Sequence, residues 1–152
     1  MKTNHPNALQ RGFSLLEVLV TMVVLSLALL GLAGMMASTL RSNHSAYHRS
    51  QATWLAYDMI DRARANRDRA LAQSYNLVLD ATATEPSSGQ PVPMHQQDLA
   101  EWRADIAQAL PGGTGSVAVT PATRRITVII QWDDSRGAGG STAQQFRVDS
   151  QL

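Results

Sequence analysis

An uncharged, mostly apolar segment of 23 residues, Val18 to Leu40, constrains this chain more than any other feature. As an α-helix it would extend about 35 Å at a rise of about 1.5 Å per residue, which is enough to cross the roughly 30 Å hydrocarbon core of a bilayer. Lys2 and Arg11 precede the segment, and the next charge after it is Arg41. This distribution favours a membrane-spanning helix with its N-terminus in the cytoplasm.

Composition excludes several classes of protein. The chain has 152 residues, the usual size of one domain rather than two. Its net charge of +1 gives no basic excess of the kind that nucleic-acid binding needs. It contains no cysteine, which excludes disulfides, thiol nucleophiles and cysteine metal sites.

Two simpler interpretations of the apolar segment fit less well. A secretory signal peptide has an apolar core of about 7–15 residues followed by a small-residue cleavage site. Here the core is longer, and the nearest small-residue candidate, Ala37-Ser38-Thr39, lies inside it. A plain membrane anchor does not explain Glu17 at the edge of the apolar block. An acidic residue there costs a few kcal/mol, and such residues are usually paired and functional.

The run Arg11-Gly12-Phe13-Ser14-Leu15-Leu16-Glu17-Val18-Leu19 resembles the class III signal of type IV pilins and type II secretion pseudopilins. The resemblance implies that a prepilin peptidase cuts between Gly12 and Phe13, and that Phe13 is then N-methylated. It also implies that Glu17 pairs with the N-terminal amine of a neighbouring subunit during assembly. Many major pilins have a proline well inside this helix; here Gly31 and Gly34 could loosen it instead.

The resemblance implies three parts of the chain. Residues 1–12 would be a cleaved leader, 13–40 the transmembrane and assembly half of the N-terminal helix, and 41–152 a periplasmic pilin-like head. The protein would first lie in the inner membrane and then in the pilus at the cell surface. Its partners would be the prepilin peptidase, the inner-membrane assembly platform, the major pilin and other minor pilins.

The helix is predicted to continue to about Asn66, because no proline or glycine occurs from Arg41 to Leu79. Apolar residues at helical spacing predict a buried stripe: Ala52, Leu55, Ala56, Met59 and Ala63. Asp58–Arg62 and Arg64–Asp68 are predicted i,i+4 ion pairs on the solvated side.

The rest of the chain predicts a loop, a short helix and three strands. Residues 81–96 contain several Pro, Ser and Gly residues and predict the loop. Asp98 to Glu101 has the pattern of a capping box, and Pro111-Gly112-Gly113 would end the helix. Alternating apolar residues predict an antiparallel sheet; they are Val117, Val119, Ile126, Val128, Ile130, Trp132, Phe146 and Val148. The expected fold is α+β: a pilin-like lollipop whose long N-terminal helix, half transmembrane and half amphipathic, packs on a small sheet.

Later segments are similar to one group of minor pilins, the type IV pilus modification proteins (PilV). The segments are Ser50–Arg62, Leu99–Trp102, Leu110–Gly115 and Ile130–Asp133. This similarity implies a scarce subunit that helps to start the pilus and lies near its tip. A minor pseudopilin of a type II secretion system and a membrane-anchored binding module that never enters a filament are the alternatives.

No motif predicts an enzyme, a cofactor or a metal site. His44 and His48 have i,i+4 spacing but lack a third ligand, so solvated histidines near the membrane edge are expected. The run from Gly112 to Ser116 lacks the lysine of a phosphate loop and predicts a helix-to-strand connection. Asp133-Asp134 predicts a turn rather than a calcium site. The three tryptophans are expected in the head core or its interfaces.

Overall fold

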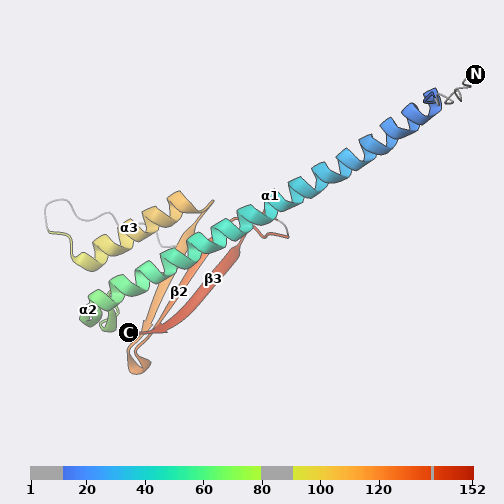
Figure 1. Cartoon of the computed structure of the whole chain (residues 1–152). Helices are drawn as coiled ribbons and strands as arrows, with labels where there is room; N and C mark the ends of the chain where they lie inside the picture. The colour runs from blue at the N-terminus through green and yellow to red at the C-terminus, as the bar shows by residue number, and fades with distance from the viewer. Residues whose placement is uncertain (1–11, 80–90, 138) are drawn as a thin grey trace, which may run out of the picture. The chain divides into compact units, whose positions relative to one another are not determined.

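The computed structural model describes residues 12–79, 91–137 and 139–152. The elements follow in the order α1 (Leu15–Ala65), α2 (Arg67–Leu71), α3 (Met94–Ala109), β1 (Thr114–Thr120), the 3-10 turn η1 (Pro121–Thr123), β2 (Arg125–Trp132) and β3 (Gln144–Gln151) (Figure 1). The predicted α+β fold, with a long N-terminal helix packed on a small antiparallel sheet, is confirmed. The chain divides into two compact units, Met1–Thr39 and Leu40–Leu152.

In the first unit, the described residues form the start of α1. The helix runs without interruption through Gly31 and Gly34, so neither glycine breaks it. Every side chain from residue 12 to 39 is exposed, although the most apolar 18-residue window of α1 has a mean hydropathy of 2.5. The helix is long and apolar enough to cross a membrane.

The second unit contains the sheet, whose strand order is β1-β2-β3 with antiparallel pairing throughout. Alternate residues of the central strand point into the core, as the sequence pattern predicts: Ile126, Val128, Ile130 and Trp132 are all buried. Leu77 forms an isolated bridge with Val117 on the outer side of β1. Phe146 and Val148 of β3 are only partly buried against the same core.

The core of this unit lies between the sheet, the C-terminal half of α1 and α3. The buried α1 residues are Ala52, Ala56, Met59, Ile60 and Ala63. Trp102 of α3 is fully buried in the same core. The Trp102 indole Nε1–H donates to the Leu55 carbonyl over 2.7 Å and so joins α3 directly to α1. The predicted helix stripe and the predicted strand faces therefore share one core.

The predicted start of α3 was wrong. The helix begins at Met94, where Pro93 passes from extended backbone into the helix, and no side-chain capping bond is made. Asp98 and Glu101 lie one and two turns further on and bind other partners, namely Tyr75 and Arg62. Proline fixes φ near the helical value and has no N–H to satisfy, so it is well suited to a helix start.

One of the two predicted ion pairs was also wrong. Arg62 Nε lies 2.8 Å from Asp58 Oδ2, as predicted. Arg64 instead lies 3.1 Å from Asp61 and donates to the Ser150 hydroxyl over 2.9 Å. The predicted Arg64–Asp68 pair fails because α1 ends at Ala65, and a separate helix then carries Asp68.

Candidate functional site

The first candidate site is the Gly12–Phe13 junction. Both residues are exposed and lie before the first residue of α1. The Phe13 side chain is 85% exposed, and a Cβ built on Gly12 would meet nothing within 4 Å. The described part of the chain therefore leaves this peptide bond open, and a larger residue at position 12 would clash with none of it.

Ser14 caps the N-terminus of α1, and Glu17 lies in the first turn. The Ser14 carbonyl accepts from the backbone N–H groups of Glu17 and Val18 over 3.0 and 3.2 Å, and its hydroxyl accepts from Leu16 N–H over 3.3 Å. Ser14 is thus the capping residue and Glu17 is the third helical residue, in the turn where the helix dipole favours a negative charge. The Ser-x-x-Glu spacing of Ser14 and Glu17 is a sequence signal that marks this helix start.

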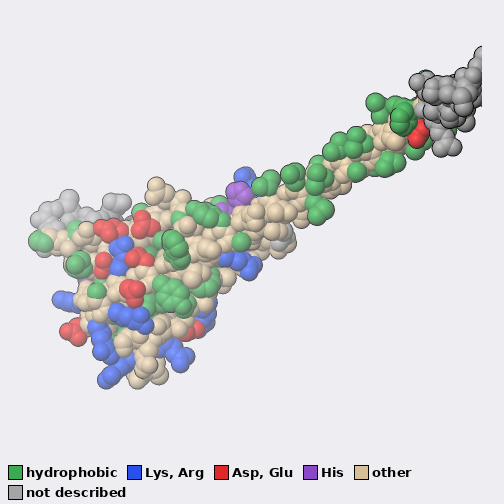
Figure 2. Space-filling model, viewed as in Figure 1, with side chains coloured by type: hydrophobic (Ala, Val, Ile, Leu, Met, Phe, Trp, Pro, Cys, Tyr) green, Lys and Arg blue, Asp and Glu red, His purple; other side chains and the backbone are tan. Residues whose placement is uncertain are grey.

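The apolar part of α1 has no cover from the residues that the structure describes. Leu16, Val23, Leu30 and Met36 each expose half or more of their surface. Figure 2 shows hydrophobic side chains along this stretch of the helix. So large a continuous apolar surface marks a site for a membrane or another protein.

A second exposed surface lies on α1 within the second unit. Tyr47, Trp54 and Tyr57 are 59%, 73% and 51% exposed. Their positions, i, i+7 and i+10, put them on one face of the helix, and the buried stripe from Ala52 to Ala63 lies on the other. We call these three residues the aromatic face. Trp54 thus does not belong to the core, whereas Trp102 and Trp132 do.

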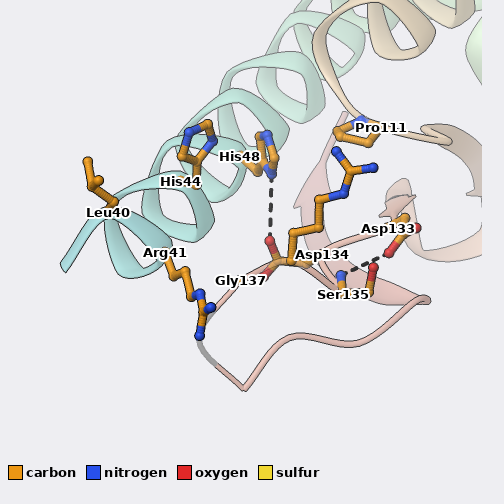
Figure 3. Close-up of a pocket in the computed structure, with 10 residues that line it drawn as sticks. Leu40, Arg41, His44, His48, Pro111, Asp133, Asp134, Ser135 and Gly137 are labelled. Atoms are coloured by element: carbon orange, nitrogen blue, oxygen red, sulfur yellow. Dashed lines mark hydrogen bonds and ion pairs between the residues drawn. The ribbon is translucent and has the colours of Figure 1, made fainter. Parts of the chain in front are cut away.

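The two histidines have different surroundings. His44 is exposed, as expected, but the His48 side chain is only 16% exposed and its Nδ1 lies 3.6 Å from Asp134 Oδ1 (Figure 3). The Ser45 hydroxyl donates to Asp134 Oδ2 over 2.6 Å. The expectation of a solvated His48 was therefore wrong. Ser45 and Asp134 are 89 residues apart, and no local pattern pointed to their contact.

Arg62 is at the centre of an acidic group that joins α1 to α3. Its guanidinium lies 2.8 Å from Asp58, 3.0 Å from Glu101, 3.7 Å from Asp98 and 3.9 Å from Asp105. The Tyr75 hydroxyl donates to Asp98 over 2.5 Å. Burial, followed by this hydrogen bond, raises the pKa of Tyr75 to about 12. The arrangement is that of a structural network between two helices.

Among the residues that the structure describes, no group of three or more His, Asp or Glu side chains could hold a metal ion. Gly112 and Gly113 lie in the connection from α3 to β1, where Gly112 has a φ of +57°, and Gly115 is the second residue of β1. A Cβ at Gly115 would lie 2.5 Å from the Trp102 ring, so this glycine permits the close packing of strand and helix.

Comparison with protein families gives one match. Residues 7–33 match the model of the prokaryotic N-terminal methylation motif, a segment that includes Gly12, Phe13 and Glu17. Neither the curated proteins nor the solved structures contain a match to the chain. The motif supports a type IV pilin-like protein with a class III signal. Together with the exposed apolar helix, it indicates processing by a prepilin peptidase and anchoring in a membrane.

Proposed function

We propose that this chain is a minor pilin of a type IV pilus, of the PilV group, that helps to initiate assembly and is incorporated near the pilus tip. One observation carries the proposal: an exposed Gly12–Phe13 junction, inside a matched methylation motif, stands directly before an uncovered apolar helix. The later segments that resemble PilV favour the minor pilin over a minor pseudopilin of type II secretion. The protein would act as a structural subunit and not as an enzyme.

The first step is cleavage between Gly12 and Phe13 on the cytoplasmic side of the inner membrane. Residues 1–12 leave as the leader, and Phe13 becomes the N-terminus and is methylated. Glycine suits the position before the cut because a protease can approach its backbone closely. The exposed position of this bond outside α1 is supporting evidence, since a peptidase cannot easily act on a peptide bond inside a helix.

The second step is transfer of residues 13–40 from the bilayer into the filament by the inner-membrane assembly platform. Glu17 would pair with the Phe13 amine of a neighbouring subunit. A carboxylate and an amine are each costly in an apolar medium, and pairing lowers both costs. Residues 41–152 form the periplasmic head. There the aromatic face on α1 offers a contact surface to the major pilin or to other minor pilins.

The mass of the mature N-terminus tests the proposal most directly. A protein that starts at N-methylated Phe13 and is found in sheared pili supports the minor pilin. A start at Met1 would support a membrane-anchored binding module instead. A processed protein that co-purifies with a secretion complex, and not with pili, would support the pseudopilin.

Glu17→Val separates processing from assembly. We expect synthesis, insertion and cleavage to continue, because the variant removes a charge that costs about 2–4 kcal/mol in an apolar block. We expect less of the subunit in sheared filaments and an unchanged or larger amount in membranes. Glu17→Gln is the matched control, since it keeps a polar side chain near the helix start but cannot form an ion pair. Wild-type filament content for both cleaved variants would remove Glu17 from the mechanism.

A further inference from the structure

The sheet of the second unit has one covered edge and one open edge. On the outer side of β1, Leu77 exchanges two backbone hydrogen bonds with Val117, over 2.8 and 2.9 Å. On the same side, Asn76 Oδ1 accepts from Val119 N–H over 2.8 Å. On the outer side of β3, at the opposite edge, the described part of the chain supplies no further strand (Figure 1). An open edge of this kind can pair with a strand of another chain.

The hydrogen-bond ladder shows which backbone groups of β3 lie on the open edge. Val117 bonds to Leu77, so its backbone groups turn away from the opposite residue in β2, Val128. Val128 therefore turns towards β3 and bonds to its partner there, Val148. Because the direction alternates along a strand, the even-numbered residues of β3 bond to β2, and the odd-numbered residues turn their N–H and C=O groups outwards.

The outward-turned residues are Gln145, Arg147, Asp149 and Gln151. Arg64 donates to Gln151 O over 3.2 Å and so occupies one end of the edge. The backbone N–H and C=O groups of Gln145, Arg147 and Asp149 bond to none of the residues that the structure describes. Each of these three residues thus offers one donor and one acceptor to a second strand.

The side chains of the four outward-turned residues carry a self-complementary charge pattern. All four are exposed, on the face of β3 that points away from the core. The Arg147 guanidinium lies 3.1 Å from the Asp149 carboxylate. This hydrogen bond lowers the pKa of Asp149, so both groups are charged at neutral pH. Along the strand the order is neutral, positive, negative, neutral, and an antiparallel copy presents the reverse order.

One antiparallel register between two β3 strands uses this pattern. When the pairing is centred on Val148, Arg147 of each copy lies opposite Asp149 of the other, and the outward backbone groups of both strands meet. A register centred on Arg147 or on Asp149 would place two like charges directly opposite, which is unfavourable. At the centre, the partly buried Val148 side chains of the two copies lie opposite each other on the core side. Charge therefore selects a single register, and that register also joins apolar side chains.

We propose that β3 pairs with β3 of a second copy of this chain in the register centred on Val148. The two sheets then form one continuous sheet around a two-fold axis. Because residues 73–77 cover the β1 edge, a third copy has no equivalent edge left to join. The axis is perpendicular to the sheet, so residues 40–65 of α1, which pack on the sheet, run in opposite directions in the two copies.

The direction of the two helices limits where such a pair can occur. Neighbouring subunits of one filament point the same way along its axis, whereas the paired copies point in opposite ways. Under the proposed function, the pair would therefore join the tips of two pili that approach each other. This consequence rests on the proposed function, but the pairing of the two β3 strands does not.

Cysteine cross-linking of the full chain in detergent micelles reads the register directly, because the native chain has no cysteine. In a non-hydrogen-bonded pair at the centre, the two Cα atoms lie about 4.5 Å apart, which a disulfide can bridge. Val148→Cys is therefore expected to give a covalent dimer on a non-reducing gel after mild oxidation.

Gln145→Cys is the matched control on the same strand. Its two copies are separated by the distance from residue 145 to residue 151, about 20 Å, so this variant is expected to stay monomeric on the gel. A covalent dimer from Gln145→Cys but not from Val148→Cys would overturn the register. No covalent dimer from either variant would overturn the pairing itself.

Charge exchange provides a second test, in which sedimentation equilibrium measures self-association of the full chain in the same detergent. Arg147→Asp and Asp149→Arg each place like charges opposite in a pair of identical copies, and each is expected to weaken self-association about tenfold. An equal mixture of the two variants sets two acids opposite two arginines and is expected to associate at least as tightly as the wild type. Arg69→Asp changes an exposed arginine of α2, which precedes the segment that covers β1, and is expected to keep the wild-type association.

The outcomes separate this inference from the proposed function. A folding defect cannot explain restoration by mixing, so a mixture that does not associate refutes the pairing. A wild type that sediments as a monomer at every concentration, beside normal processing at Gly12 and a normal amount in sheared pili, overturns the pairing alone. A dimer of an unprocessed chain that is absent from pili overturns the minor pilin alone.

Discussion

Two buried tryptophans permit a matched comparison of a bonded and an unpartnered indole N–H. Trp102 and Trp132 are both 1% exposed or less. The Trp102 indole N–H donates to Leu55 O over 2.7 Å, whereas Trp132 Nε1 is buried without a partner among the described residues. Replacement of each by phenylalanine removes the same atoms from the same core. The difference between the two variants therefore combines the loss of the Trp102–Leu55 bond with the removal of the unpartnered Trp132 N–H.

The expected magnitudes follow from the environment of each ring. Both variants lose packing, but only Trp102→Phe loses a bond, which adds about 0.5–1.5 kcal/mol to its cost. Trp132→Phe removes an unsatisfied buried N–H, whose burial costs about 1–3 kcal/mol, so it is expected to be nearly neutral or slightly stabilising. Trp132→Ala leaves a cavity under β2 and is expected to cost about 3–5 kcal/mol.

Denaturant unfolding of the full chain in detergent, followed by near-UV circular dichroism, measures these differences. The denaturant midpoint is expected to be highest for Trp132→Phe, lower for Trp102→Phe and lowest for Trp132→Ala. The dependence of the free energy of unfolding on denaturant is expected to stay unchanged, since the surface exposed on unfolding changes little. Equal losses for the two phenylalanine variants would contradict the expected difference between a bonded Trp102 N–H and an unpartnered Trp132 N–H. A wild-type midpoint for Trp132→Ala would refute the packing of β2 against α1.

Three other predictions concern separate parts of the chain. Gly12→Leu is expected to leave an uncleaved precursor of full mass on a denaturing gel. Membrane insertion is expected to stay normal, because position 12 has open space in the described structure. Protein of the mature size would contradict this prediction. Because the pKa of Tyr75 is raised to about 12, its hydroxyl stabilises the folded state fully below pH 10, and this stabilisation is lost as the pH rises towards 12. The free energy of unfolding is expected to fall by roughly 2–3 kcal/mol over that range. Tyr75→Phe is expected to show no such fall in unfolding curves measured at the same pH values. Trp54→Ala is expected to change the free energy of unfolding by less than about 0.5 kcal/mol, since the Trp54 side chain is 73% exposed. The amount of this variant in sheared pili is expected to fall. A normal amount would exclude the aromatic face from assembly.

The sequence predicted the elements of the fold well because periodicity reflects burial. Ala52, Ala56 and Met59 recur at helical spacing, and all three are buried. Ile126 and Val128 alternate with more exposed residues, and both point into the core. Such patterns are local, so they need no knowledge of which segments meet.

Errors arose where distant segments decide the outcome. Arg64 binds Ser150 of β3 because α1 ends one residue later and lies beside the end of that strand. Asp134 is buried because Ser45 and His48, far away in the sequence, supply its partners. The Asp98–Glu101 spacing imitates a helix start, but its carboxylates serve Tyr75 and Arg62 instead. None of these contacts has a local signature.

The Gly12–Phe13 junction and Glu17 depend on each other chemically. Before cleavage, the Phe13 nitrogen is a neutral amide within the chain, so it offers no charge to a carboxylate. Cleavage after Gly12 makes it an amine that stands just before Ser14, at the positive end of the α1 dipole, where a cation is unfavourable. Glu17, on the third helical residue, already offsets the dipole of its own helix. In the proposed function the new amine pairs with the Glu17 of another subunit, and processing then has to come before assembly because only cleavage creates that amine.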